Sequence, residues 1–351
     1  RLHADAREQH RIFLDQPVFH TLPVHEHQGV FGYITALGQG VGADALQRRL
    51  PGDDLIQHPI GCLNLFRGIT SGIVPVDLSV FHQTSHSARI CIQLIITGMK
   101  DEIVERLRRL NQEFYQSFSD SFSSTRGRIQ PGVRKQLEEM PMRGKFLDIG
   151  CGNGNLAIEW QKSGREGSYL GIDFSDEFVQ IAQDKLKFVP PSNGQLMSFT
   201  SIDINEADWE DQLPNLLWQT VMLYAVLHHI PSALRREQLM QSIHHIMPEG
   251  GVFFLSVWQI HNSQRLMKRI QPWSTAGIDE KDVEPGDVLM DWRAEDQIAS
   301  GRTGLRYVHI FSMEELAFLA EKTGFKAVNS FFSDGREGNL ALYQKWEKVL
   351  V

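Results

Sequence analysis

A glycine-rich turn preceded by an acid is the part of this sequence best suited to hold a ligand. An apolar run at 146–149 leads into Gly150, Gly152 and Gly154. Glycines permit positive φ angles and lack the Cβ atoms that would keep a ligand away from the backbone. Asp148 stands just before these glycines and adds a carboxylate to the turn. We therefore expect the turn to cradle part of a cofactor.

A second acid, Asp173, ends the next apolar run. It follows the turn by ~20 residues, the distance at which dinucleotide sites place the acid that binds the ribose hydroxyls. The glycine spacing is G-x-G-x-G, whereas a pyrophosphate-binding loop normally reads G-x-G-x-x-G. The pattern predicts an adenosine-containing cofactor without phosphates.

Polar residues also follow the third and fourth apolar runs. Asp203 is placed to accept a hydrogen bond from an adenine amino group, with the Ile204 amide beside it, and the alternative is that Asp203 is a strand-end cap. His228 and His229 come directly after the fourth run. We expect one of these histidines to face the substrate while the other packs or hydrogen-bonds.

Apolar runs typical of strands alternate with helical patterns along most of the chain. The predicted strands are Lys145–Ile149, Tyr169–Asp173, Gln195–Ile202, Thr220–Leu227, Gly251–Trp258, Lys326–Phe332 and Asn339–Trp346. The predicted helices between and around them are Val133–Met140, Asn155–Ser163, Asp176–Phe188, Ala233–Ile246 and Ser312–Thr323, the last begun by a Ser312-x-x-Glu315 capping box. This order predicts an α/β fold with a doubly wound, mostly parallel seven-stranded sheet that ends in an antiparallel hairpin. Ligands should bind at the carboxyl ends of the parallel strands.

The chain changes in composition near Met99. Residues 1–98 contain no Lys, Met or Trp but hold 8 of the 14 histidines. A helix is predicted from Asp101 to about Ser121, because apolar residues recur there at helical spacing. We expect the catalytic domain to span 99–351, with a polar insertion over the active site at about 261–304. The segment 1–98 is either a poorly structured extension or a translation artefact.

Composition excludes several classes of protein. The chain has 351 residues, 42% of them apolar, which is enough to bury a full core. Its apolar runs are too short to span a bilayer, and its three cysteines form no C-x-x-C pair, so we expect a cytoplasmic protein that uses neither a membrane nor a zinc site. The histidines of the first segment lack carboxylates at a metal-binding spacing, and no metal is expected. A net charge of −8 argues against nucleic-acid binding through the overall field.

The glycine turn with its two acids resembles the cofactor-binding half of class I S-adenosylmethionine-dependent methyltransferases, a Rossmann-like family. Four further segments resemble the tRNA methyltransferases that esterify 5-carboxymethyluridine at the wobble position: 118–126, 225–229, 286–292 and 306–311. That resemblance spans about residues 110–347. Gln219, Val308 and Leu340 depart from it, where the family has an acid, a tyrosine and a tryptophan.

The resemblance implies S-adenosylmethionine as cofactor, with Asp148 helping to hold its methionine end. We predict cofactor contacts from Asp148, Gly150, Gly152, Asn153, Gly154, Asp173, Phe174, Asp203, Ile204 and Tyr224. The predicted catalytic residues are Arg126, His228, Tyr307 and His309, and the predicted substrate-binding residues are Arg126, Arg128, His229 and Arg306. An ionised carboxylate needs alignment rather than a strong base, and cationic or hydrogen-bonding side chains suit that task.

The implied partners are tRNA and a small zinc-binding activator subunit. Basic residues that could hold tRNA are Arg126, Arg128, Arg134, Lys135, Arg265, Lys268 and Arg269, although solvated helix faces explain them equally well. Two alternatives remain open. The chain could methylate a small-molecule carboxylate, hydroxyl or amine, or it could be a cofactor-binding partner subunit without turnover.

Overall fold

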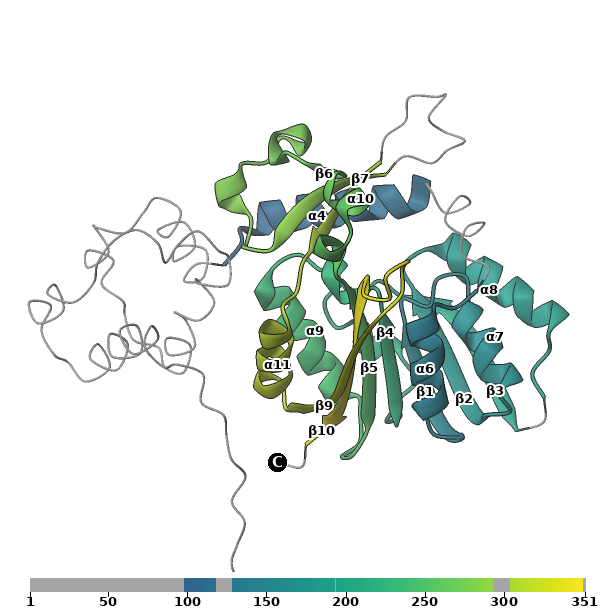
Figure 1. Ribbon diagram of the computed structural model, residues 1–351. Helices are drawn as coiled ribbons and strands as arrows, with labels where there is room; N and C mark the ends of the chain where they lie inside the picture. The colour runs from purple at the N-terminus through teal and green to yellow at the C-terminus, as the bar shows by residue number, and fades with distance from the viewer. Residues whose placement is uncertain (1–97, 118–127, 193, 293–303, 350–351) are drawn as a thin grey trace, which may run out of the picture. The chain divides into compact units, whose positions relative to one another are not determined.

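The computed structural model describes residues 98–117, 128–192, 194–292 and 304–349 (Figure 1). The strands are β1 (Arg143–Ile149), β2 (Glu166–Asp173), β3 (Gln195–Ser201), β4 (Thr220–Tyr224), β5 (Val252–Trp258), β6 (Ile270–Gln271), β7 (Asp287–Trp292), β8 (Gly304–His309), β9 (Phe325–Ser333) and β10 (Ala341–Lys348). The α-helices are α4 (Asp101–Ser117), α6 (Pro131–Glu139), α7 (Asn155–Lys162), α8 (Asp176–Phe188), α9 (Ala233–His245), α10 (Gln264–Met267) and α11 (Met313–Lys322). Short 3₁₀ turns include η5 (Leu227–His229) and η8 (Glu280–Asp282).

Seven strands form one sheet in the order β3-β2-β1-β4-β5-β10-β9. Strands β1 to β5 pair in parallel, and β10 runs antiparallel to both β5 and β9. The predicted fold class is therefore confirmed, including the closing hairpin. The order reverses direction between β1 and β4, which is where open α/β sheets bind their ligands.

Two helix layers cover the sheet because successive side chains of a strand point to opposite faces. In β1, Phe146 packs in a cluster with Trp160 of α7 and Val179 of α8. Its neighbour Leu147 packs in the other cluster, with Ile243 of α9 and side chains of α11. The middle of each central strand is buried under a helix layer, so the polar side chains of the site lie at the strand ends.

A smaller three-stranded antiparallel sheet, β6-β7-β8, lies beside helix α4 (Figure 1). Leu107 of α4, Leu289 of β7 and Tyr307 of β8 share one apolar cluster with Trp273. We call α4 and this sheet the cap. The polar stretch 261–304 was expected to be an insertion over the active site, and its described part contains β6 and β7. Strand β7 pairs with β6 on one side and on the other with β8, nearly all of which follows the stretch.

Two sequence expectations fall partly outside the described residues. The segment 1–97 and Arg126 both lie there, so the division at Met99 stays a prediction. Within the described residues, no helix combines the length and apolar composition needed to cross a membrane. The same part of the chain holds no group of three metal-ligating side chains.

Candidate functional site

A cavity of about 520 Å³ opens at the carboxyl ends of the parallel strands. Its wall combines the glycine turn, the ends of β1, β2 and β4, one face of α4, and part of the β9–β10 hairpin. Cavities of this size hold small molecules and cofactors. The sequence placed its ligand at this edge of the sheet, and the cavity lies there.

The glycine turn forms one wall of the cavity. Gly150 has φ 73°, and a Cβ atom there would lie 2.3 Å from Val226 Cγ2, so a side chain is excluded. Gly152 has φ 52°, and a Cβ atom there would meet nothing within 4 Å. Lys185 fixes the turn from outside by donating to the Asn153 carbonyl at 2.7 Å. The turn thus has a rigid base and an open rim, which lets a ligand approach its backbone.

Asp173 holds the turn in shape from the end of β2. Its Oδ2 accepts a hydrogen bond from the Gly152 amide at 2.9 Å, and its Oδ1 accepts one from the Ser175 amide at 3.0 Å. Burial raises the pKa of this carboxyl to about 6, partly offset by those amides. Each carboxylate oxygen has a second lone pair, so the group can still accept hydrogen bonds from ligand hydroxyls.

Asp148 is a buried carboxyl at the other end of the turn, 3% exposed. Burial raises its pKa to about 7, against the effect of the Tyr169 hydroxyl, which donates to Oδ2 at 2.5 Å. Neither Asp148 nor Asp173 forms an ion pair with another described residue. A ligand that brings a cation to Asp148 and hydroxyls to Asp173 therefore fits this cavity. S-adenosylmethionine, with an ammonium group and a ribose, meets both requirements.

Cofactor affinity should depend on pH through Asp148. Below a pKa of about 7 the carboxyl is neutral and cannot pair with an ammonium group, so the Kd for S-adenosylmethionine should fall by about tenfold from pH 5.5 to pH 7. Isothermal titration calorimetry measures this dependence. The Asp148→Asn variant should bind S-adenosylmethionine more weakly, and its Kd should lose most of the pH dependence. An unchanged pH dependence in that variant would contradict the assignment.

Asp203, predicted to contact adenine, is not among the residues that line the cavity, and its carboxylate bonds to other side chains. Its Oδ2 accepts from Arg108 at 3.0 Å and Gln112 at 2.9 Å, both on α4, and its Oδ1 accepts from Asn205. The neighbours Ile202, Ile204 and Asn205 line the cavity instead. The carboxylate therefore anchors α4 over the third strand, because two donors from that helix occupy one of its oxygens.

Helix α4 supplies a set of cavity residues that the sequence analysis missed. Arg108, Asn111, Gln112 and Tyr115 all line the cavity. They recur at helical spacing beside the apolar stripe that was recognised, so a search for a polar stripe next to it would have found them. No local signal shows that this face meets the sheet edge.

The chain after β4 turns earlier than expected. The strand was predicted to reach Leu227, but it ends at Tyr224 because Ala225 takes the left-handed conformation, with φ 55°. The turn η5 then sends the two histidines in different directions. His228 is fully buried against Trp258 and lies outside the cavity lining, whereas His229 lines the cavity. A direct catalytic role for His228 is therefore not supported, and its neighbour is the one that faces a ligand.

Arg306 lines the cavity in an aromatic surround. Its guanidinium carbon lies 4.4 Å from the ring centre of Trp258, 5.1 Å from that of Phe114 and 5.6 Å from that of Trp292. The residue is 3% exposed. Aromatic faces stabilise a guanidinium while limiting its hydration, which strengthens its attraction for an anion that enters the cavity.

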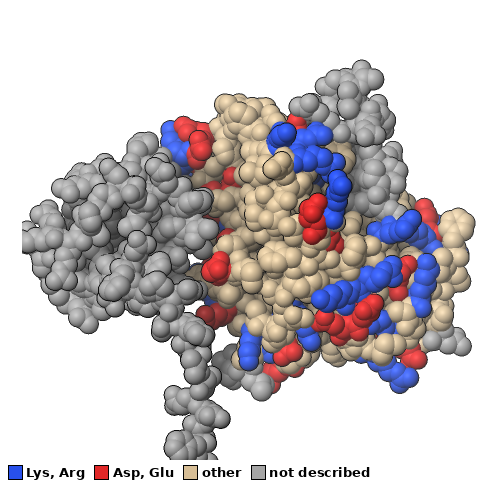
Figure 2. Space-filling view, in the orientation of Figure 1, with Lys and Arg blue, Asp and Glu red and all other residues tan. Residues whose placement is uncertain are grey.

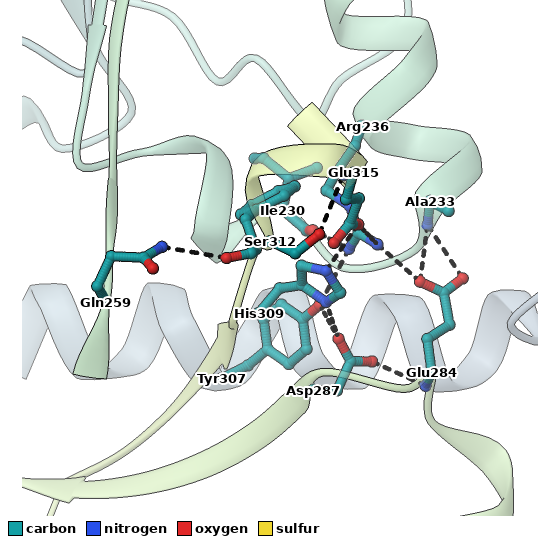
Figure 3. A network of polar contacts seen from close by, with 11 residues as sticks. Ile230, Ala233, Arg236, Gln259, Glu284, Asp287, Tyr307, His309, Ser312 and Glu315 are labelled. Atoms are coloured by element: carbon teal, nitrogen blue, oxygen red, sulfur yellow. Dashed lines mark hydrogen bonds and ion pairs between the residues drawn. The ribbon is translucent and has the colours of Figure 1, made fainter. Parts of the chain in front are cut away.

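Tyr307 and His309 lie in a buried polar network rather than in the cavity wall (Figure 3). Asp287 Oδ1 accepts from the Tyr307 hydroxyl and bonds His309 Nδ1, each at 2.7 Å. Glu315 lies 2.9 Å from His309 Nε2, and Arg236 pairs with Glu284 at 2.9 Å. The catalytic roles predicted for Tyr307 and His309 are not supported, because their polar atoms bond to cap and core residues. The network ties β7 and β8 to α9 and α11.

The predicted capping box at Ser312 forms only in part, because the buried network uses the side chain of Glu315. Ser312 Oγ accepts from the Glu315 amide at 3.0 Å, as expected for a helix N-cap. The Glu315 carboxylate bonds His309 instead of returning to the first turn.

The network should make stability depend on pH. Burial and Arg236 oppose protonation of His309, but Glu315 and Asp287 outweigh them and raise its pKa to about 8. The protonated form thus stabilises the folded state below pH 6.5, and this contribution of about 2 kcal/mol is lost as pH rises through 8. Chemical denaturation at pH 6.5 and 9 measures the loss. His309→Gln should reduce that pH dependence, while His245→Gln, at an exposed site on α9, should leave it unchanged.

The remaining predicted basic residues are dispersed. Arg128 lines the cavity mouth and is exposed, as are Arg265 and Lys268, and Figure 2 shows Lys and Arg side chains gathered over α10. Arg134 pairs with Glu159 at 3.0 Å, and Arg269 pairs with Asp291 at 3.4 Å. Because a carboxylate neutralises part of their charge, Arg134 and Arg269 attract a polyanion less strongly than unpaired arginines would.

Comparisons with known proteins identify a family and several similar proteins. A family model described as a methyltransferase domain matches residues 121–330. A tRNA (carboxymethyluridine(34)-5-O)-methyltransferase of Schizosaccharomyces pombe is 25% identical over 227 residues, which cover 60% of this chain and 86% of that protein. A carboxy-S-adenosyl-L-methionine synthase of Campylobacter jejuni is 23% identical over 248 residues, 67% of this chain and 94% of that protein. A solved S-adenosylmethionine-dependent methyltransferase of Methanosarcina mazei is similar with a TM-score of 0.48 and 18% identity, over 64% of this chain and all of that one.

Proposed function

The chain belongs to the methyltransferase domain family, and from that premise we propose that it methylates the carboxylate of 5-carboxymethyluridine at the wobble position of tRNA. The chain is an S-adenosylmethionine-dependent methyltransferase. The acceptor is the part we propose. It rests on the resemblance of four segments to tRNA methyltransferases and on the chemistry of the cavity.

The cofactor would be held by the glycine turn, by Asp173 at its ribose and by Asp148 at its ammonium group. When bound, S-adenosylmethionine supplies a methyl group attached to a sulfonium, an electrophile that takes an electron pair from an acceptor oxygen. Asp148 and Asp173 are both buried, so their contacts with such a ligand would be shielded from water. Tyr224 also lines this part of the cavity, and its hydroxyl forms no hydrogen bond with a described residue.

One observation carries the acceptor proposal: Arg306 lies against Trp258 in the wall of the cavity that contains the glycine turn. A guanidinium binds a carboxylate with two parallel hydrogen bonds, and the aromatic rings offer a surface for a planar base. An ionised carboxylate is already a nucleophile at neutral pH. The chain must then align the anion and remove its water, and a desolvated arginine suits both tasks.

A tRNA acceptor would need local contacts, because the net charge is −8. The exposed residues Arg128 and Arg265 line the cavity, and the exposed Lys268 lies close to Arg265 in sequence, between α10 and β6. We propose these residues as phosphate contacts, with Arg126, outside the described residues, as a further candidate. The resemblance adds a small zinc-binding activator subunit as a partner, and the cysteine usage favours the cytoplasm as the location; we retain both as proposals.

A small-molecule acceptor is the second candidate. Leu340 lines the cavity at a position where the tRNA enzymes have a tryptophan, so one surface for base stacking is reduced here. The overall negative charge also favours a small acceptor over a polyanion.

Radiolabelled methyl transfer tests the proposal. The full chain, with and without a zinc-binding activator, is incubated with labelled S-adenosylmethionine and either tRNA from a strain that lacks wobble methyl esters or a small-molecule extract. We expect label in 5-methoxycarbonylmethyluridine, identified by nucleoside mass spectrometry and released by mild alkali as an ester should be. Label confined to small molecules would establish the second candidate. Cofactor binding without any transfer would contradict both.

A further inference from the structure

Tyr115 and His229 form a hydrogen-bonded pair in the cavity wall. The Tyr115 hydroxyl lies 2.7 Å from His229 Nε2, and both side chains line the cavity. The rings meet edge to face with centres 5.4 Å apart. The two residues come from distant parts of the chain, since Tyr115 belongs to α4 and His229 to the turn after β4.

The direction of this hydrogen bond follows from what surrounds the imidazole. His229 Nδ1 lies 3.0 Å from the Tyr307 carbonyl oxygen, which can only accept a hydrogen bond. Nδ1 must therefore carry hydrogen. In a neutral imidazole the other nitrogen then accepts, so the Tyr115 hydroxyl donates its one hydrogen to Nε2.

Asn111 fixes the backbone that sets this direction. Its Oδ1 accepts from the Tyr307 amide at 2.7 Å, and its Nδ2 donates to the Tyr307 carbonyl at 3.3 Å and the His229 carbonyl at 3.1 Å. Asn111 is 7% exposed. One buried amide thus holds α4, β8 and the turn after β4 together, and the carbonyl that orients the imidazole cannot rotate away.

We propose that Tyr115 is a ligand-binding residue whose oxygen accepts a hydrogen bond from an O–H or N–H group of the bound ligand. Its own hydrogen is held by His229, so the hydroxyl offers only lone pairs to the cavity. His229 and Asn111 are positioning residues that act through it. The donor group belongs either to the cofactor or to the methyl acceptor, and only the second case rests on the proposed function.

Tyr115→Phe removes the oxygen and keeps the ring contacts with Phe114 and Phe174, whose centres lie 5.1 Å and 6.2 Å away. Two quantities are measured: the Kd for S-adenosylhomocysteine by calorimetry, and KM and kcat with whichever acceptor takes label from the wild-type chain. We expect about a tenfold increase in either the Kd or the KM. A raised Kd assigns the donor to the cofactor, and a raised KM with unchanged Kd assigns it to the acceptor. If Kd, KM and kcat all stay within about twofold, the proposal is overturned.

His229→Phe and the double variant test whether His229 acts through Tyr115. The double variant should lose no more affinity than Tyr115→Phe alone, because the two changes remove one interaction. Losses that simply add would mean that His229 contributes separately, and the positioning role would be wrong. Thermal unfolding of each variant checks that the fold is intact. The Kd measurements do not depend on tRNA, so failure of the proposed tRNA activity would be recognised apart from failure of this inference.

Discussion

Arg306→Met should reduce methyl transfer to the acceptor by about 100-fold while the Kd for S-adenosylhomocysteine changes by less than about twofold. The guanidinium is the cation of the aromatic wall, and an acceptor carboxylate that loses a buried partner of this kind loses a few kcal/mol of binding. Methionine fills much of the same volume and packs well on aromatic rings, so the fold should tolerate it. Steady-state kinetics and calorimetry measure the two quantities.

Two further variants test whether the loss of transfer comes from the charge and the geometry of Arg306. Arg306→Lys keeps the charge but loses the planar pair of donors, so transfer should fall by an intermediate factor. Arg143→Met, which removes an exposed arginine paired with Glu166 at the far end of β1, should leave transfer unchanged. A parallel loss of cofactor affinity in Arg306→Met would show that the arginine supports the cavity as a whole instead of binding the acceptor.

Asp173→Asn should raise the Kd for S-adenosylmethionine by at least about 100-fold. Both oxygens of Asp173 accept from backbone amides, so the NH₂ group of an asparagine would face the amide of either Gly152 or Ser175. A buried donor that faces another donor costs about 1–3 kcal/mol, and the loss of the negative charge next to the ribose adds to it. The glycine turn should therefore lose its shape as well as its acid.

Asp176→Asn is the matched control for this variant. Asp176 is an exposed acid in the first turn of α8, three residues further on, and it makes no contact with the glycine turn among the described hydrogen bonds. Its replacement should leave the Kd within about twofold. If Asp173→Asn binds the cofactor nearly as well as the wild type, the acid is not a cofactor ligand and the cavity would have to hold the molecule in another way.

The cap shows why its residues were harder to assign from sequence than those of the central sheet. Arg306, Tyr307 and His309 were all predicted to act on the substrate. In β8 the side chains alternate, so Arg306 faces the cavity while Tyr307 and His309 point into the buried network. The polar stretch before them contains two strands, β6 and β7, which pair with each other, and β7 also pairs with β8. Nothing local marks such a pairing.

Helix α4 was predicted correctly as a helix, but the function of its polar side could not be predicted. Its apolar stripe was evident from the spacing of Leu107 and Phe114, and both side chains are buried. The polar stripe beside it, with Asn111 and Tyr115, became significant only because the helix crosses the sheet edge and meets the turn after β4.

Local patterns by themselves determined the family of this protein, the order of its main strands and helices, and the glycine turn that lines the cavity. Those features depend on the period of apolar residues and on backbone angles that only glycine adopts readily, and both can be read from neighbouring residues. The opposite wall of the cavity was predictable only in part: Arg306 and His229 were predicted to bind substrate and do line the cavity, whereas Tyr115 and the burial of Tyr307 and His309 emerged only from the tertiary structure. Arg306, Tyr115 and His229 come from three elements that meet in space, and the side of a strand or helix that faces the cavity is set by packing between elements, which no short stretch of sequence contains.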